Sequence, residues 1–102
     1  MGNDAFSRIV QAFELDGWHR IDSGADYASL EYYDRVIGFS QRDTGKVIGR
    51  VQIVLDTDGR YVVRMPNSNP FSTGAAAYRS FRKNVKSLQK LGLLGKGQRR
   101  NG

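Results

Sequence analysis

The sequence predicts an α+β domain, with an N-terminal helix, an antiparallel sheet of three or four strands, and a C-terminal amphipathic basic helix. Three observations predict it. Apolar residues recur at helical spacing in the first 17 residues and again from about 74 to 91. Between about 29 and 65, apolar and polar residues alternate as they do in strands. A chain of 102 residues has room for one core, so we expect a single domain over 1–93 and a flexible basic tail over 94–102.

The first helix is predicted from one apolar stripe and two boundary signals. Its apolar residues stand at i, i+3, i+4 and i+7, and they are Phe6, Ile9, Val10 and Phe13. Asp4 is a suitable cap and Gly17 a suitable stop. A short strand over 18–22 and a polar bend over 23–26 should follow.

The sheet is predicted from alternation and from turn residues. One face should carry Val47, Val51, Ile53, Leu55, Tyr61, Val63 and Met65, and the other Arg50, Gln52, Asp56 and Arg64. The segment 56–59 ends in Asp-Gly, which tolerates the positive φ angles of a tight hairpin turn. We expect another turn over 42–45, a bulge or break near Asp34, and a loop bracketed by Pro66 and Pro70.

The last helix is predicted to be about 27 Å long, at ~1.5 Å per residue, with an apolar and a basic side. The apolar side should hold Ala77, Tyr78, Phe81, Val85, Leu88 and Leu91. The basic side should hold Arg79, Arg82, Lys83, Lys86 and Lys90. Glycines 92, 95 and 97 end the helix, and the tail adds Lys96, Arg99 and Arg100.

Charge is distributed very unevenly along the chain. Residues 1–34 hold two basic and seven acidic side chains, whereas residues 35–102 hold fourteen basic and three acidic ones. After Asp58 there are ten Lys or Arg and no acid. Like charges at i,i+4, as in Arg79 and Lys83, oppose helix formation, and a phosphate backbone would relieve that repulsion. This pattern favours a polyanionic partner, although the acidic first third is an intramolecular alternative.

A second candidate surface is the outer face of the sheet, where Arg35, Arg50 and Arg64 would lie together. Tyr32 and Tyr33 are candidates for stacking on bases, but aromatic residues at such spacing usually belong to the core, and we favour the core.

Other chemistries are not supported. Gly45-Lys46 is followed by Val47 where a phosphate-binding loop needs Ser or Thr, and the turn over 56–59 lacks the later ligands of a calcium loop. With no cysteine and one histidine we expect no metal site and no cofactor. His19 is the one candidate general base, and nothing in the sequence provides it with a nucleophile. No apolar run approaches the roughly 18 residues of a membrane span, and the start is unlike a signal peptide, so we expect a cytoplasmic protein with no membrane partner.

The order of elements is that of the double-stranded-RNA-binding-like fold, and within it the chain resembles the HicA family of small messenger-RNA interferases. The resemblance rests on Gly17-Trp18 after the first helix, on the bend at Ser23-Gly24-Ala25, and on Pro66 after the last strand. It implies an RNA- or DNA-binding fold. Ala25 stands where the family's catalytic histidine should follow the bend, and His19 comes too early to replace it without a shift of alignment.

These observations favour a non-catalytic nucleic-acid-binding domain that contacts phosphates through its last helix and tail. Two alternatives stay open. One is a HicA-like ribonuclease that uses His19, and the other is an inhibitor or regulator that docks its basic helix on an acidic protein.

Overall fold

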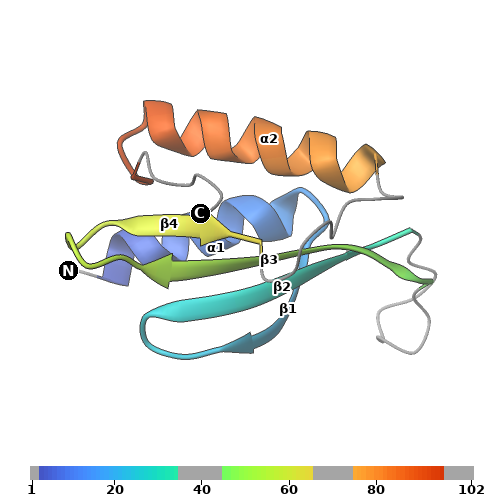
Figure 1. Cartoon of the computed structure of the whole chain (residues 1–102), viewed down its shortest axis with the longest axis horizontal. Helices are drawn as coiled ribbons and strands as arrows, with labels where there is room; N and C mark the ends of the chain where they lie inside the picture. The colour runs from blue at the N-terminus through green and yellow to red at the C-terminus, as the bar shows by residue number, and fades with distance from the viewer. Residues whose placement is uncertain (1–2, 35–44, 66–74, 96–102) are drawn as a thin grey trace.

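The computed structural model describes residues 3–34, 45–65 and 75–95, which form two helices and one sheet (Figure 1). The elements are α1 (Asn3–Leu15), β1 (His19–Ser23), β2 (Tyr27–Tyr33), β3 (Val47–Leu55), β4 (Tyr61–Arg64) and α2 (Ala75–Lys90). The strands form a four-stranded antiparallel sheet in the order β1-β2-β3-β4. The predicted α+β class is confirmed, and the sheet has four strands, the larger of the two numbers expected.

Both helices end in the same way, at a glycine in the left-handed region. Gly17 has a φ of 104° and Gly92 a φ of 77°. After α1, the Trp18 amide donates to the Phe13 carbonyl at 3.1 Å, and after α2, the Leu93 amide donates to the Leu88 carbonyl at 2.9 Å. This six-to-one bond with a left-handed glycine is the Schellman motif, which satisfies carbonyls that the helix leaves unpaired. The predicted stop signals therefore act through backbone hydrogen bonds.

The turn between β3 and β4 is the hairpin predicted from Asp-Gly. Gly59 has a φ of 86°, and its amide donates to the Asp56 carbonyl at 3.0 Å. The carboxylates of Asp56 and Asp58 accept from the amides of Thr57 and Arg60 at 2.8 and 3.1 Å. These acidic side chains stabilise the turn.

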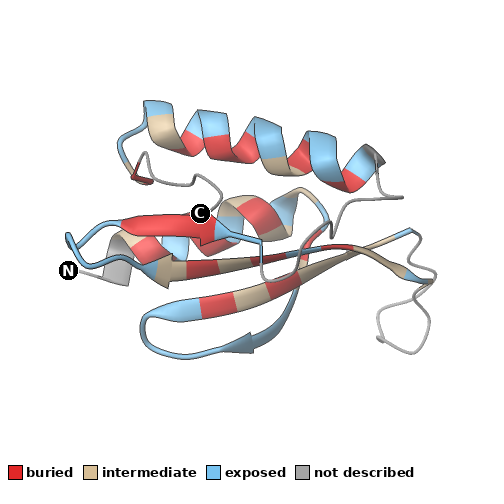
Figure 2. Ribbon diagram, in the orientation of Figure 1, coloured by how far each residue is buried: buried red, intermediate tan, exposed pale blue. Residues whose placement is uncertain are grey.

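One face of the sheet carries both helices, and the core lies between them (Figure 2). The register pairs Leu30 with Val51 and Ile53 with Val63, so that these four side chains share the inner face. The buried cluster comprises Phe6, Ile9, Val10, Phe13, Trp18, Ala28, Leu30, Val51, Ile53, Tyr61, Val63, Ala77, Val85, Leu88 and Leu94. The segment after α2 also covers the edge of β4, because the Gly95 amide donates to the Tyr61 carbonyl at 2.8 Å.

Two details of the sheet differ from the prediction, and a third confirms it. Leu55 and Met65 have the inward phase but are each 42% exposed; Leu55 is the last residue of β3, and Met65 directly follows β4. The irregularity expected near Asp34 is a register shift between Tyr32 and Tyr33. A second register shift, between Arg20 and Asp22, was not foreseen. The expected turn over 42–45, apart from Gly45, and the loop with Pro66 and Pro70 lie outside the described residues.

Candidate functional site

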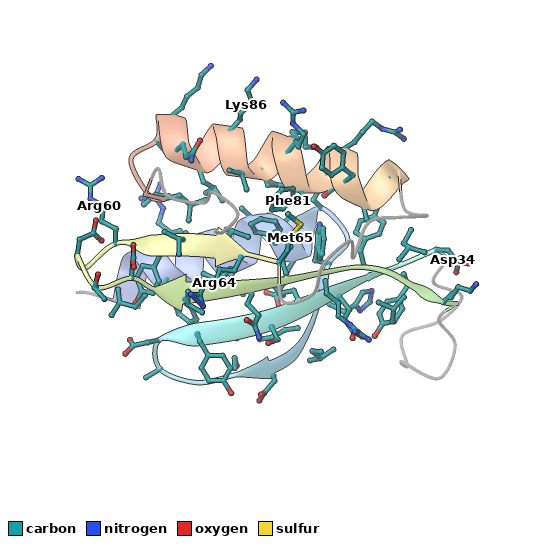
Figure 3. The ribbon with its side chains drawn as sticks, viewed as in Figure 1. Asp34, Arg60, Arg64, Met65, Phe81 and Lys86 are labelled. Atoms are coloured by element: carbon teal, nitrogen blue, oxygen red, sulfur yellow. The ribbon has the colours of Figure 1, made fainter. Side chains whose placement is uncertain are left out.

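The basic residues of α2 all lie on the exposed side of the helix. We call this set the cationic face, and it consists of Arg79, Arg82, Lys83, Lys86 and Lys90, all of them exposed. Figure 3 shows Lys86 extending away from the sheet. Ala77, Val85 and Leu88 bury the opposite side of the helix, so burial of the apolar side leaves the cations in solvent. The predicted clustering of these five residues is confirmed.

The buried side of α2 is more polar than predicted. Ser80 and Asn84 are only 7% and 8% exposed, whereas Tyr78 and Leu91, which were expected to be buried, are 42% and 62% exposed. Phe81 is partly buried at the edge of the core. The prediction placed Tyr78 and Leu91 inside on hydrophobicity alone. In the structure the buried side of α2 includes Ser80 and Asn84 in place of Tyr78, and the helix ends at Lys90, before Leu91.

The two buried polar residues of α2 are explained by a hydrogen-bond network centred on Asp16. The Asp16 carboxylate accepts bonds from the Ser80 hydroxyl, from Asn84 Nδ2 at 2.9 Å and from Lys83 Nζ at 3.2 Å. Trp18 Nε1 donates to Ser80 Oγ at 2.8 Å, and Asn84 Nδ2 also donates to the Ser80 carbonyl at 2.8 Å. The network joins the end of α1 and the start of β1 to the middle of α2. It was not predicted from the sequence; the available signal was a serine and an asparagine, four residues apart, inside an apolar stripe.

The donors around Asp16 stabilise its charged form. The hydrogen bond from Ser80, followed by those from Asn84 and Lys83, holds the pKa of the Asp16 carboxyl below its usual value of 3.8, against partial burial, which would raise it. Asp16 is therefore a carboxylate at neutral pH.

Asp16 neutralises only one member of the cationic face. Its ion pair with Lys83 joins side chains that are 29% and 68% exposed, respectively. Arg82 lies 5.8 Å from the centroid of the Tyr78 ring, at which distance a cation and an aromatic ring attract. Among residues 3–34, 45–65 and 75–95, no carboxylate forms an ion pair with Arg79, Arg82, Lys86 or Lys90. Among the side chains that the structure describes, the acidic first third thus pairs with this face at a single position.

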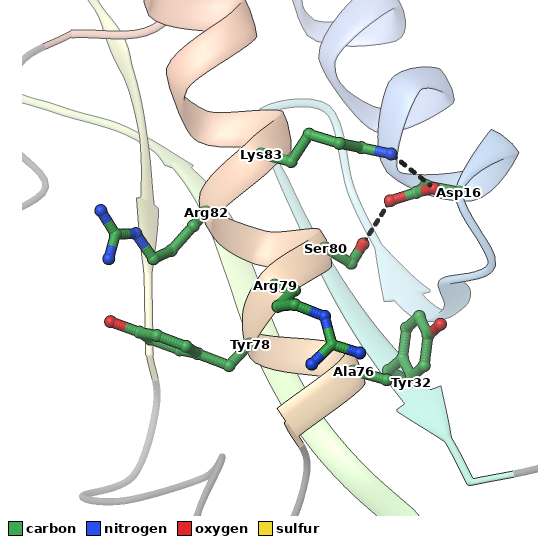
Figure 4. A pocket seen from close by; sticks show the side chains of 8 residues that line it. All are labelled: Asp16, Tyr32, Ala76, Tyr78, Arg79, Ser80, Arg82 and Lys83. Atoms are coloured by element: carbon green, nitrogen blue, oxygen red, sulfur yellow. Dashed lines mark hydrogen bonds and ion pairs between the residues drawn. The ribbon is translucent and has the colours of Figure 1, made fainter.

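An open pocket of about 710 Å³ lies at the first turns of α2 (Figure 4). It is lined by Asp16, Tyr32, Ala76, Tyr78, Arg79, Ser80, Arg82 and Lys83. The pocket therefore shares three cations with the cationic face and adds two tyrosines to them.

The other face of the sheet, which we call the open face, bears a different set of side chains. It carries His19, Glu31, Tyr33, Arg50, Gln52 and Arg64, and no described helix covers it. Arg50 Nε donates to Glu31 at 2.9 Å, and the Tyr33 hydroxyl donates to the same carboxylate at 2.9 Å. Burial and this hydrogen bond raise the pKa of Tyr33. Of the secondary candidates, Arg50 is thus already paired, Arg64 is exposed, and Arg35 lies outside the described residues.

His19 lies on the open face, with its ring centroid 5.1 Å from that of Tyr33. The adjacent tyrosines face opposite sides of the sheet, because Tyr32 packs edge-on against Trp18, 5.2 Å between centroids, on the helix side. Within the described parts of the chain no group of three or more His, Cys, Asp or Glu side chains is arranged to hold a metal ion.

None of the described helices is both long and apolar enough to cross a membrane. The tail cations Lys96, Arg99 and Arg100 lie outside the described residues.

Comparison with known proteins adds nothing to this geometry: no family model matches the chain, and no curated protein or solved structure matches it either.

Proposed function

We propose that this chain is a nucleic-acid-binding domain that contacts the phosphate backbone through the cationic face of α2. The observation that carries the proposal is the concentration of five exposed cations on one side of a helix that contains no acid. Four of them have no ion-pair partner within the described residues.

Repulsion along the cationic face, and its relief by a polyanion, supports the proposal. Arg82 and Lys86, and also Lys86 and Lys90, are like charges one helical turn apart, and such pairs destabilise a helix. A nucleic acid places negative charge along that line and releases its own counterions when it binds. Phosphate contacts of this kind position a protein on nucleic acid without reading its sequence. We expect Lys96, Arg99 and Arg100 to add affinity of the same unspecific kind.

The test compares two charge reversals of equal size. The first variant carries Lys86→Glu and Lys90→Glu on the cationic face. The matched control carries Arg60→Glu and Arg64→Glu, two exposed arginines that no described carboxylate pairs with (Figure 3). Lys83 is left unchanged, because a glutamate there would repel Asp16 and disturb the fold.

Binding is measured by fluorescence anisotropy with labelled RNA and DNA at several salt concentrations. We expect the Lys86/Lys90 variant to bind all sequences more weakly, and the slope of log K against log salt to fall by about 0.7–0.9 for each phosphate group that the variant no longer binds. The control should bind nearly as the wild type does. Weakened binding in the control alone would move the interface away from α2. If the wild type binds no nucleic acid even at low salt, the proposal is wrong and an acidic protein becomes the better partner.

A further inference from the structure

Tyr32 is held as a fixed aromatic wall of the pocket at the first turns of α2. It lies near the end of β2 on the helix side, and its ring packs edge-on against Trp18 at an interplanar angle of 66°. The ring also approaches Gly17 so closely that a Cβ there would lie 3.4 Å from it. Trp18 is in turn buried and hydrogen-bonded to Ser80. The ring is therefore positioned by its neighbours before any ligand arrives.

Arg79 faces the same pocket from the first turns of α2. Figure 4 shows its guanidinium reaching toward the ring of Tyr32, with Ala76 between them. Within the described residues it has no carboxylate partner. Tyrosine rings and arginine planes are the surfaces on which proteins stack unpaired bases, because every base has a π-face.

The charge of the pocket suits the phosphates on either side of such a base. Its lining holds Arg79, Arg82 and Lys83 against Asp16 alone, a formal balance of +2. Asp16 already accepts hydrogen bonds from Ser80, Asn84 and Lys83. A volume of about 710 Å³ falls within the roughly 300–1,000 Å³ typical of small-ligand sites.

We propose that this pocket takes an unpaired nucleobase, stacked on Tyr32 and Arg79, while the neighbouring phosphates lie on the cationic face. This inference rests on the proposed function and makes it more specific. A base inside a duplex is paired and stacked on its neighbours, so the site favours single-stranded nucleic acid, or an unpaired end or bulge, over a regular duplex.

The experiment uses strands that differ only in their bases. A labelled oligothymidylate of about ten nucleotides is compared with an abasic strand of the same length and charge. Binding of each to the wild type, Tyr32→Leu and Tyr32→Phe is measured by anisotropy. Tyr33→Leu serves as the control, since Tyr33 lies on the open face.

We expect the wild type to bind the thymidylate strand about 5- to 150-fold more tightly than the abasic strand. Tyr32→Leu should lose this preference while binding the abasic strand as the wild type does, whereas Tyr32→Phe and Tyr33→Leu should keep the preference. A folding defect would weaken binding of both strands, so the ratio reports on the stacked base alone. Equal binding of the two strands by the wild type, or an unchanged ratio in Tyr32→Leu, would overturn the inference and leave phosphate binding standing. Failure of both strands to bind, together with failure of the labelled RNA and DNA of the first test to bind at low salt, would instead refute the proposed function.

Discussion

Phe13 and Phe81 show how strongly a phenylalanine's role depends on where its helix meets the core. Phe13 is 0% exposed and packs edge-on against Trp18, with ring centroids 5.7 Å apart. Phe81 packs against the cluster from its edge and remains partly buried. The same side chain therefore removes more apolar surface from water at position 13 than at position 81.

We predict that Phe13→Ala lowers the free energy of unfolding by about 3–5 kcal/mol, the usual cost for a fully buried phenylalanine, and that Phe81→Ala costs clearly less. Urea unfolding followed by circular dichroism measures both, with an unchanged m-value showing that only stability has altered. A larger destabilisation for Phe81 than for Phe13 would mean that the core is centred on α2 and not between the helices and the sheet.

At the scale of elements, α1 and α2 are joined through Asp16 as well as through apolar packing. Ser80 and Asn84 would be costly to bury without partners, and the carboxylate at the end of α1 supplies them. Because the pocket with Tyr32 and Arg79 lies beside this junction, the network also fixes the distance between the two sides of that pocket. The packing of the helices thus shapes the candidate binding site.

We predict that the stability contributed by Asp16 depends on pH. The folded pKa is lowered below 3.8, so this contribution is fully present above the pKa of the unfolded chain and is lost as the pH falls through the folded value. Thermal unfolding between about pH 6 and pH 2 should therefore show a steeper acid destabilisation in the wild type than in Asp16→Asn. Glu14→Gln is the control, because Glu14 forms an exposed ion pair with Arg20 and should change the profile little. Parallel profiles for wild type and Asp16→Asn would show that the carboxylate does not stabilise this junction.

At the scale of the whole molecule, the sheet separates two polar surfaces. The cationic face and the pocket lie on the helix side, while His19, Tyr33, Glu31 and Arg50 lie on the open face. A strand held on α2 would therefore run on the opposite side of the molecule from the single histidine. This separation argues for binding without participation of His19.

We predict that His19→Ala leaves nucleic-acid affinity within about twofold of the wild type, less than the tenfold that ~1.4 kcal/mol would produce. Anisotropy titrations test the affinity, and incubation with labelled RNA followed by gel electrophoresis tests for cutting. If the purified protein cuts RNA and a folded His19→Ala variant does not, the binding-only proposal is wrong and the HicA-like ribonuclease alternative is supported.

Much of the fold was predictable because local patterns specify it. The stripe from Phe6 to Phe13 predicts α1, the alternation around Val51 and Ile53 predicts β3, and Asp-Gly at 58–59 predicts the hairpin. The cationic face was predictable for the same reason, since helical periodicity alone places its residues on one side. The prediction was wrong in burying Leu55, Tyr78 and Leu91. Hydrophobicity does not show where a helix or strand ends, or which residues around a helix face the sheet.

The sequence by itself determined the order of elements, the hairpin turn over 56–59, the glycine stops of both helices and the side of α2 on which positive charge collects, whereas α1 already includes Asp4, which was expected to cap it. These features depend on residues within about one helical turn or one hairpin of each other along the chain, so local sequence is enough to specify them. Only the tertiary structure decided that Asp16 meets Ser80, Asn84 and Lys83, more than sixty residues away. It also decided that Tyr32 and Arg79 line one pocket. Such meetings depend on how two helices pack on a sheet of given register, and no periodicity along the chain contains that geometry.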